Sequence, residues 1–273
     1  MKLCTIRRSG ATYAARVEGD TFVELPYGDV GALLADPDGL GVATAHAGPA
    51  RPLDPSTLAP LIVRPPKIIC VGMNYAAHIA EMGRKPPSHP TFFAKFTNAL
   101  IGARDPILLP PESDSVDWEV ELAAVIGTPA RRVPTERALD HVAGYTVLND
   151  ISMRDFQYRT AQFLQGKTFE ACTPLGPWLV TADELPPGGS PLNVTCEVDG
   201  VVMQDSSTSD LIFSVAELIS YFSTITTLEP GDVIATGTPA GVGAGRDPQV
   251  FLRRGNVVRT YVEGIGELVN ECV

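Results

Sequence analysis

The chain has 273 residues, of which 44% are hydrophobic, and it carries a formal net charge of −11 at pH 7. This composition is that of a folded globular protein, with enough length for one large core or for one core plus a small accessory domain. The acidic balance argues against nucleic acids and anionic membrane surfaces as partners, because both require a basic face.

The N-terminal part of the chain predicts a small β domain. Residues 2–25 form short strand-like segments separated by turns at Ser9-Gly10 and Gly19-Asp20, and residues 29–35 have a helical pattern. Six prolines between positions 48 and 66 then predict a linker without regular structure, because proline fixes φ and lacks an amide hydrogen. We therefore expect a small domain over residues 1–64 and a second domain over residues 65–273.

The second domain is expected to be rich in strands. It begins with an apolar segment at residues 67–72 that is typical of a buried strand, and many short strands and turns follow. Helices are predicted only at residues 74–82, 153–163 and 214–223, the last with apolar side chains at helical spacing. The expected fold class is therefore α+β with a predominance of β structure.

Targeting and redox signals predict an intracellular protein. The N-terminus has no apolar segment of signal-peptide length, and no later segment has the ~20 apolar residues that a membrane helix needs. Five scattered cysteines fit reduced thiols better than a disulfide framework. We expect a soluble, cytoplasmic chain.

The most informative pattern is the alternation of acidic residues at Asp117, Glu119 and Glu121. On a strand all three side chains would point to one face, where like charges repel and a bound cation would relieve the repulsion. The alternative is an edge strand that carries charge on its solvent-exposed face. A second strand-like segment, residues 143–150, ends at Asp150, so that a third carboxylate could join the first two.

Carboxylate oxygens are hard ligands, and they suit Mg²⁺ or Mn²⁺, with Ca²⁺ also possible. Zinc is not expected, because the chain has no C-x-x-C motif and its four histidines show neither H-x-H nor H-E-x-x-H spacing.

Other polar residues permit either a catalytic or an ordinary structural interpretation. His78 and Glu81 would share a helix face and could form a general-base dyad, or they could be a solvated pair on the surface. Lys95, Arg154 and Lys167 could bind a carboxylate or an oxyanion in a pocket, or could be surface cations. The hydroxyl of Thr238 lies in a glycine-rich turn where a small anion could be bound.

Five segments taken together resemble the fumarylacetoacetate hydrolase family, and in particular its acylpyruvases and 2-hydroxyhepta-2,4-diene-1,7-dioate isomerases. The match runs in order from about residue 67 to the end. The segments are Gly-Met-Asn-Tyr-Ala-Ala-His78, Asp-Trp-Glu119-Val-Glu121, Gly-Tyr-Thr-Val-Leu-Asn-Asp150-Ile-Ser-Met-Arg154-Asp-Phe-Gln157, Gly-Lys167-Thr-Phe with Pro-Leu-Gly-Pro-Trp178, and Gly-Asp-Val-Ile-Ala-Thr-Gly-Thr238-Pro-Ala-Gly-Val-Gly.

The resemblance implies a mixed β-sandwich roll preceded by a small variable domain, usually as a homodimer. It implies Mg²⁺ or Mn²⁺ bound by Glu119, Glu121 and Asp150, with Asp117 as a neighbour. It also implies a water-activating dyad at the positions of His78 and Glu81, on a segment that closes over substrate. Arg154, Gln157, Lys167 and Thr238 would line the substrate pocket.

We therefore expect a metal-dependent hydrolase that cleaves a carbon-carbon bond in a β-dicarbonyl or acylpyruvate-type 2-oxo acid. Isomerisation or decarboxylation of a related, oxaloacetate-like acid would use the same chelate and enolate. A structural metal-binding protein without catalytic activity is the third possibility. One departure from the family pattern, Glu170-Ala171-Cys172 after the aromatic residue, lies near the expected pocket and leaves the substrate open.

Overall fold

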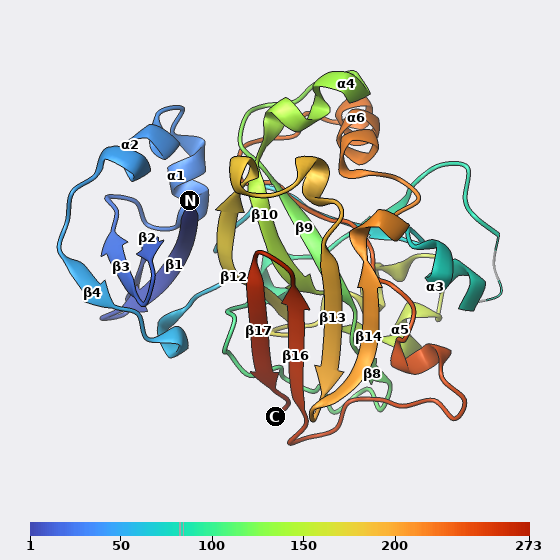
Figure 1. Ribbon diagram of the computed structural model, residues 1–273. Coiled ribbons are helices and arrows are strands. Elements are labelled where there is room, and N and C mark those ends of the chain that lie inside the picture. Colours follow the sequence, from blue (N-terminus) through green and yellow to red (C-terminus); the bar gives the residue numbers. More distant parts are fainter. Residues whose placement is uncertain (82, 84) are drawn as a thin grey trace.

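A large mixed sheet of eleven strands is the main element of the computed structural model, which describes residues 1–81, 83 and 85–273 (Figure 1). In spatial order its strands are β4 (Ala50–Pro52), β3 (Thr21–Glu24), β2 (Ala11–Glu18), β1 (Lys2–Arg8), β12 (Thr173–Thr181), β10 (Val142–Asn149), β9 (Val120–Ile126), β15 (Val233–Ala235), β5 (Ile68–Gly72) and β6 (Thr91–Ala94), with β7 (Leu100–Ile101) beside β12.

The N-terminal strands extend this sheet at one end, where Figure 1 shows them in blue. β1 pairs antiparallel with β12, with Leu3 opposite Leu179. The two predicted turns lie between β1, β2 and β3, and the helix expected at 29–35 is α1 (Val30–Ala35), capped by Asp29. A further helix, α2 (Gly39–Ala45), was not predicted.

The proline-rich segment is more regular than expected. It contains strand β4, which pairs with β3, and a 3₁₀ turn at Pro55–Thr57. Proline is tolerated here because β4 is the edge strand of the sheet. Its outer side pairs with no other strand, so a missing N–H on that side removes no hydrogen bond between strands. The division of the chain at residue 64 stays a prediction.

A second sheet packs against the first and completes a β-sandwich. Its antiparallel strands, in spatial order, are β14 (Val201–Ser207), β13 (Asn193–Val198), β16 (Val257–Val262) and β17 (Gly266–Glu271). The buried core between the sheets includes Leu122, Ala124 and Ile126 of β9, together with Val194 of β13 and Val258 of β16. Because side chains alternate along a strand, the odd-numbered residues of β9 face the opposite side of the large sheet.

Helices are short and few, as the sequence predicts. After α1 and α2, the described part of the chain forms α3 (Ala76–Glu81), α4 (Thr135–Ala138), which was not predicted, α5 (Arg154–Gln157) and α6 (Val215–Ile225). Ser214 caps α6 in a capping box with Glu217. The helix expected at 153–163 stops at Gln157, because the chain turns back until Gly166 lies against the backbone of Gln157. Position 82, at the end of the first predicted helix, lies outside the described residues.

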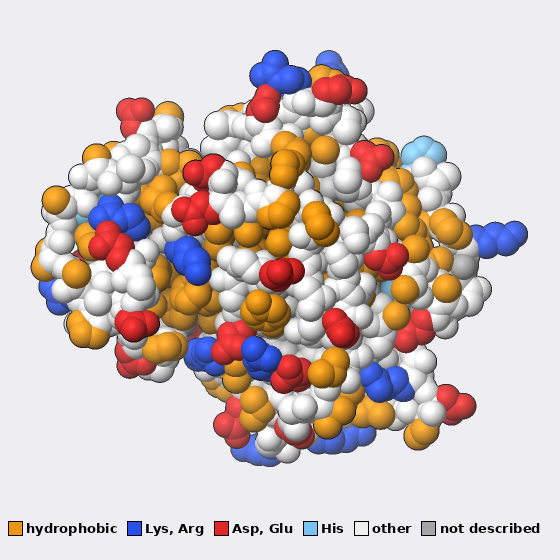
Figure 2. Space-filling model, in the orientation of Figure 1, with side chains coloured by type: hydrophobic (Ala, Val, Ile, Leu, Met, Phe, Trp, Pro, Cys, Tyr) orange, Lys and Arg blue, Asp and Glu red, His pale blue; other side chains and the backbone are white. Residues whose placement is uncertain are grey.

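These elements confirm the β-rich α+β class and the sandwich. Across the described part of the chain, no helix has the length and apolar character needed to cross a lipid bilayer. Acidic and basic side chains are interspersed over the face shown in Figure 2.

Candidate active site

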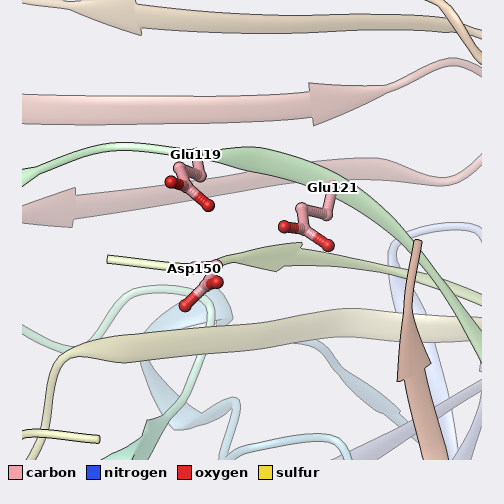
Figure 3. A group of neighbouring side chains, drawn as sticks. All are labelled: Glu119, Glu121 and Asp150. Carbon is pink, nitrogen blue, oxygen red and sulfur yellow. The ribbon is translucent and has the colours of Figure 1, made fainter. Parts of the chain in front are cut away.

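Three buried carboxylates meet on the face of the large sheet that points away from the second sheet (Figure 3). Glu119 directly precedes β9 and Glu121 is its second residue, whereas Asp150 directly follows β10. The strands are held in register by the bond from the Asp150 amide to the Glu119 carbonyl, at 2.9 Å. One oxygen from each of the three side chains lies within 4.8 Å of the others.

Asp117 is not part of this cluster, although strict alternation along one strand would place it there. The predicted strand is interrupted, because β8 (Val116–Asp117) ends before β9 begins and pairs instead with β11 (Ser152–Met153). The buried Asp117 carboxylate accepts hydrogen bonds from the amides of Gly243 and Ala244, at 2.7 and 2.9 Å. The alternation argument is therefore correct for Glu119 and Glu121 and wrong for Asp117.

Three buried cations surround the carboxylates. Lys167 donates to Glu119 at 2.8 Å and to Asp150 at 2.9 Å, and Lys95 donates to Asp150 at 2.5 Å. Arg154 lies 2.6 Å from Glu119 through one guanidinium nitrogen and donates to Asp117 at 2.8 Å through Nε.

The cations act unequally on the three carboxyl groups. Burial alone would raise the pKa of Glu119, but Lys167 and Arg154 outweigh burial and lower that pKa to about 2. Burial, followed by the charges of Asp150 and Glu119, raises the pKa of Glu121 well above its usual value. Glu121 accepts a hydrogen bond from the Gly237 amide at 2.7 Å and takes part in none of the ion pairs found among the described residues.

The donor set fits a hard divalent cation. Four buried carboxylates and three buried cations leave one formal negative charge, which is concentrated where Glu121 meets its two acidic neighbours. A divalent ion would remove this repulsion, and oxygen donors suit Mg²⁺, Mn²⁺ or Ca²⁺.

A pocket that is partly open to solvent lies beside the cluster. Six of the predicted site residues line it: His78, Glu119, Arg154, Gln157, Lys167 and Thr238. Lys95 is outside this set, since its amino group is bound to Asp150 and to the Ile151 carbonyl. Nη2 of Arg154 is buried and has no hydrogen-bond partner among the described residues, so it can donate to a ligand.

His78 and Glu81 lie on α3 and form the predicted pair, with Nδ1 of His78 3.0 Å from the Glu81 carboxylate. The other oxygen of Glu81 accepts a hydrogen bond from the amide of Gly241 at 3.0 Å. The pair therefore does not extend into free solvent as an isolated surface pair would, because it is tied to the glycine-rich segment after β15.

Sequence reasoning missed the apolar walls of the pocket. Phe93 and Phe163 contact each other with their ring centres 5.8 Å apart, and Met73, Tyr158 and Val242 are among the other residues of the lining. It also missed the role of Asp117 as the partner of Arg154 and of two backbone amides. Apolar side chains carry no local pattern that separates a pocket wall from a core, so the sequence held no signal for them.

Comparison with known proteins identifies relatives over most of the chain. The family model described as the fumarylacetoacetate hydrolase C-terminal domain matches residues 67–273. The mitochondrial oxaloacetate tautomerase FAHD2A of Bos taurus is 46% identical over 233 residues, which are 85% of this chain and 74% of the relative.

Solved structures also match over the whole chain. A 2-hydroxyhepta-2,4-diene-1,7-dioate isomerase from Mycobacterium marinum is 33% identical, with a TM-score of 0.81 over 100% of this chain and 98% of the other. A maleylpyruvate hydrolase from Sphingobium, solved with manganese(II) and pyruvate, is 29% identical, with a TM-score of 0.82 over 100% and 99%.

Proposed function

The chain belongs to the fumarylacetoacetate hydrolase family, and from that premise we propose that it is a divalent-metal-dependent enzyme that moves a proton beside the keto group of a small 2-oxo acid. Keto-enol tautomerisation of an oxaloacetate-like acid is the reaction we favour. The observation that carries this proposal is that His78 lines the same pocket as Glu119, Arg154 and Lys167. A proton-transfer group, a metal ligand and two cations thus face one cavity.

Glu119, Glu121 and Asp150 would hold the metal, for which Mg²⁺ or Mn²⁺ is our proposal. When bound, such an ion withdraws electrons from a 2-oxo group and so acidifies the neighbouring carbon. The three carboxylates come from adjacent strands of a buried sheet, and Lys95 and Lys167 fix two of them by ion pairs. The ligands are therefore held in place before any substrate arrives.

The side chains of the pocket would bind and orient the substrate. Arg154 offers Nη2 to a carboxylate or keto oxygen, since its other nitrogens are engaged by Asp117, Glu119 and Gln157. Lys167 stabilises developing negative charge on the oxygen of an enolate. Thr238, whose hydroxyl accepts from Gln204 at 2.8 Å, can donate its own hydrogen to the ligand.

His78 would transfer the proton. Its Nδ1 faces Glu81, so a Nδ1–H donated to that carboxylate leaves Nε2 as the basic nitrogen. Glu81 keeps the ring in this tautomer and orientation, and it stabilises the imidazolium that forms when Nε2 takes up a proton.

Hydrolysis of a carbon-carbon bond is the second candidate. The structural relative that acts as a maleylpyruvate hydrolase supports it, and His78 would then take the proton of a water molecule that attacks a distal carbonyl. Decarboxylation of an oxaloacetate-like acid would use the same residues. A homodimeric state and a cytoplasmic location remain predictions from the sequence.

The deciding experiment is a substrate panel assayed with Mg²⁺, with Mn²⁺ and with EDTA. Decay of the enol absorbance of oxaloacetate reports tautomerisation, pyruvate release from acylpyruvates reports hydrolysis, and carbon dioxide release reports decarboxylation. We expect metal-dependent tautomerisation that the His78→Ala variant loses while it still binds Mn²⁺. Turnover by His78→Ala equal to that of the wild type would contradict the assigned role, and a protein inert to the whole panel would contradict the proposed function.

A further inference from the structure

One glycine-rich segment contacts three separate carboxylates of the site through its backbone. The amide of Gly237 donates to Glu121 at 2.7 Å, and the amide of Gly241 donates to Glu81 at 3.0 Å. The amide of Gly243 donates to Asp117 at 2.7 Å. Residues 237–245, which we call the amide loop, therefore contact a carboxylate of the candidate metal site, the helix that carries His78, and Asp117, which pairs with Arg154.

The amide loop is held firmly on the side that faces the protein interior. Asp117 accepts from two of its amides, and the indole of Trp118 donates to the Gly241 carbonyl at 3.2 Å. A side chain at Gly241 would collide with the Met203 carbonyl, and one at Gly243 would collide with the Val250 carbonyl. The backbone of the loop therefore packs too closely on these two segments for a side chain to fit at either glycine, and its hydrogen bonds to Asp117 and Trp118 fasten it there.

Helix α3, by contrast, depends on its contacts for its position. It has six residues, whereas isolated helices shorter than about 12–15 residues are barely stable in water. Its buried anchor is Ile79, and its last residue, Glu81, contacts the amide loop. The Glu81 carboxylate uses one oxygen for Nδ1 of His78 and the other for the amide of Gly241.

We propose that Glu81 is a positioning residue that docks α3 onto the amide loop at Gly241, and that this docking sets the orientation of His78 at the pocket. The role given to His78 rests on the proposed function, whereas the docking does not. Binding of α3 and alignment of the imidazole are then a single event, because one carboxylate makes both contacts.

Gly245 is the position that makes this docking testable. A Cβ atom there would lie 2.8 Å from Cδ of Glu81 and 3.0 and 3.1 Å from its two oxygens, and these are its three nearest neighbours. The φ angle of Gly245 is outside the left-handed region, so alanine suits the backbone. Gly245→Ala should therefore displace the end of one flexible side chain and leave the fold intact.

Gly41 in α2 provides the matched control. It also lies outside the left-handed region, and no atom lies within 4 Å of a Cβ built on it. Gly41→Ala makes the same chemical change far from Glu81, so it should alter neither α3 nor turnover.

The experiment compares amide hydrogen exchange of residues 76–81 in the full-length wild type, Gly245→Ala, Glu81→Ala, the double variant and Gly41→Ala. Loss of one hydrogen bond to a charged group predicts roughly tenfold faster exchange in both single variants. The double variant should be no faster than Glu81→Ala alone, since the alanine at position 245 then has no carboxylate to displace. With an active substrate, kcat should fall in both single variants with little change in KM.

Exchange at the wild-type rate in Gly245→Ala would overturn the docking. It would also be overturned if the double variant exchanged faster than Glu81→Ala by the factor that Gly245→Ala shows alone. Faster exchange in a protein that turns over no 2-oxo acid would support the docking and refute the proposed function. A fall in kcat without faster exchange would refute the docking and leave the proposed function standing.

Discussion

Lys167→Met tests whether the buried cations stand in for part of the charge of a metal ion. Lys167 is buried and bridges Glu119 and Asp150 at 2.8 and 2.9 Å. Methionine has a similar length without the charge, so the formal charge of the cluster changes from minus one to minus two. Removing one partner of a buried ion pair costs roughly 3–5 kcal/mol.

The lower end of that range applies, because each carboxylate keeps a second cation. Glu119 retains Arg154 at 2.6 Å, and Asp150 retains Lys95. A loss of about 3 kcal/mol corresponds to a Tm lower by about 6–12 °C in a chain of this size. A divalent ion should restore much of the lost Tm. With the ion bound, the net formal charge of the cluster is zero in the variant and plus one in the wild type, so the variant gains more from binding.

The assay is thermal unfolding followed by circular dichroism, in EDTA and then over a titration with Mn²⁺. Lys67→Met is the matched control, since Lys67 also pairs with a buried carboxylate, Asp232 at 2.8 Å, outside the cluster. We expect its Tm loss to be the same with and without Mn²⁺. If the loss in Lys167→Met is equally independent of Mn²⁺, or if it is absent in EDTA, the charge argument fails.

Two further predictions separate the metal site from the scaffold. Glu121→Gln keeps an acceptor for the Gly237 amide and removes a carboxylate that has no cation in contact, so the Tm in EDTA should not fall. The affinity for Mn²⁺, measured by titration calorimetry, should fall at least about tenfold. Unchanged affinity would exclude Glu121 as a ligand. Ser214→Ala removes the capping box of α6 and should lower the free energy of unfolding, measured by urea denaturation, by about 1 kcal/mol. The affinity for Mn²⁺ should not change. A change in that affinity would show that α6 and the carboxylate cluster are coupled.

The local parts of the fold could be predicted where the sequence contains a direct physical signal. The turns at Ser9-Gly10 and Gly19-Asp20, and the apolar spacing of α6, are short-range features that depend on a few neighbouring residues. The helix expected at 153–163 is shorter because the chain turns back and packs Gly166 against the backbone of Gln157, and this close contact overrides the helical pattern. The addition of β1 to β12 joins residues about 180 positions apart, and no local pattern encodes it.

The charged residues of the site could be predicted, whereas the backbone contacts that hold them in place could not. The alternation of Glu119 and Glu121 and the acid that follows β10 predict the cluster that Glu119, Glu121 and Asp150 form. Asp117 has the same spacing and chemistry, yet the break between β8 and β9 directs it to the amide loop. Spacing alone therefore cannot distinguish a metal ligand from the carboxylate that positions the surrounding backbone.

The same distinction explains why these residues indicate a family more readily than a reaction. Tautomerisation, decarboxylation and carbon-carbon cleavage all need positive charge that stabilises an enolate. The proposed metal ligand Glu119 and the cations Arg154 and Lys167, which line one pocket, would suit each of the three reactions. What differs is whether a water molecule can reach the substrate beside His78. A stably bound water needs two to four polar partners, and the wall formed by Phe93 and Phe163 offers none. Substitutions that choose between the reactions should therefore lie in these walls.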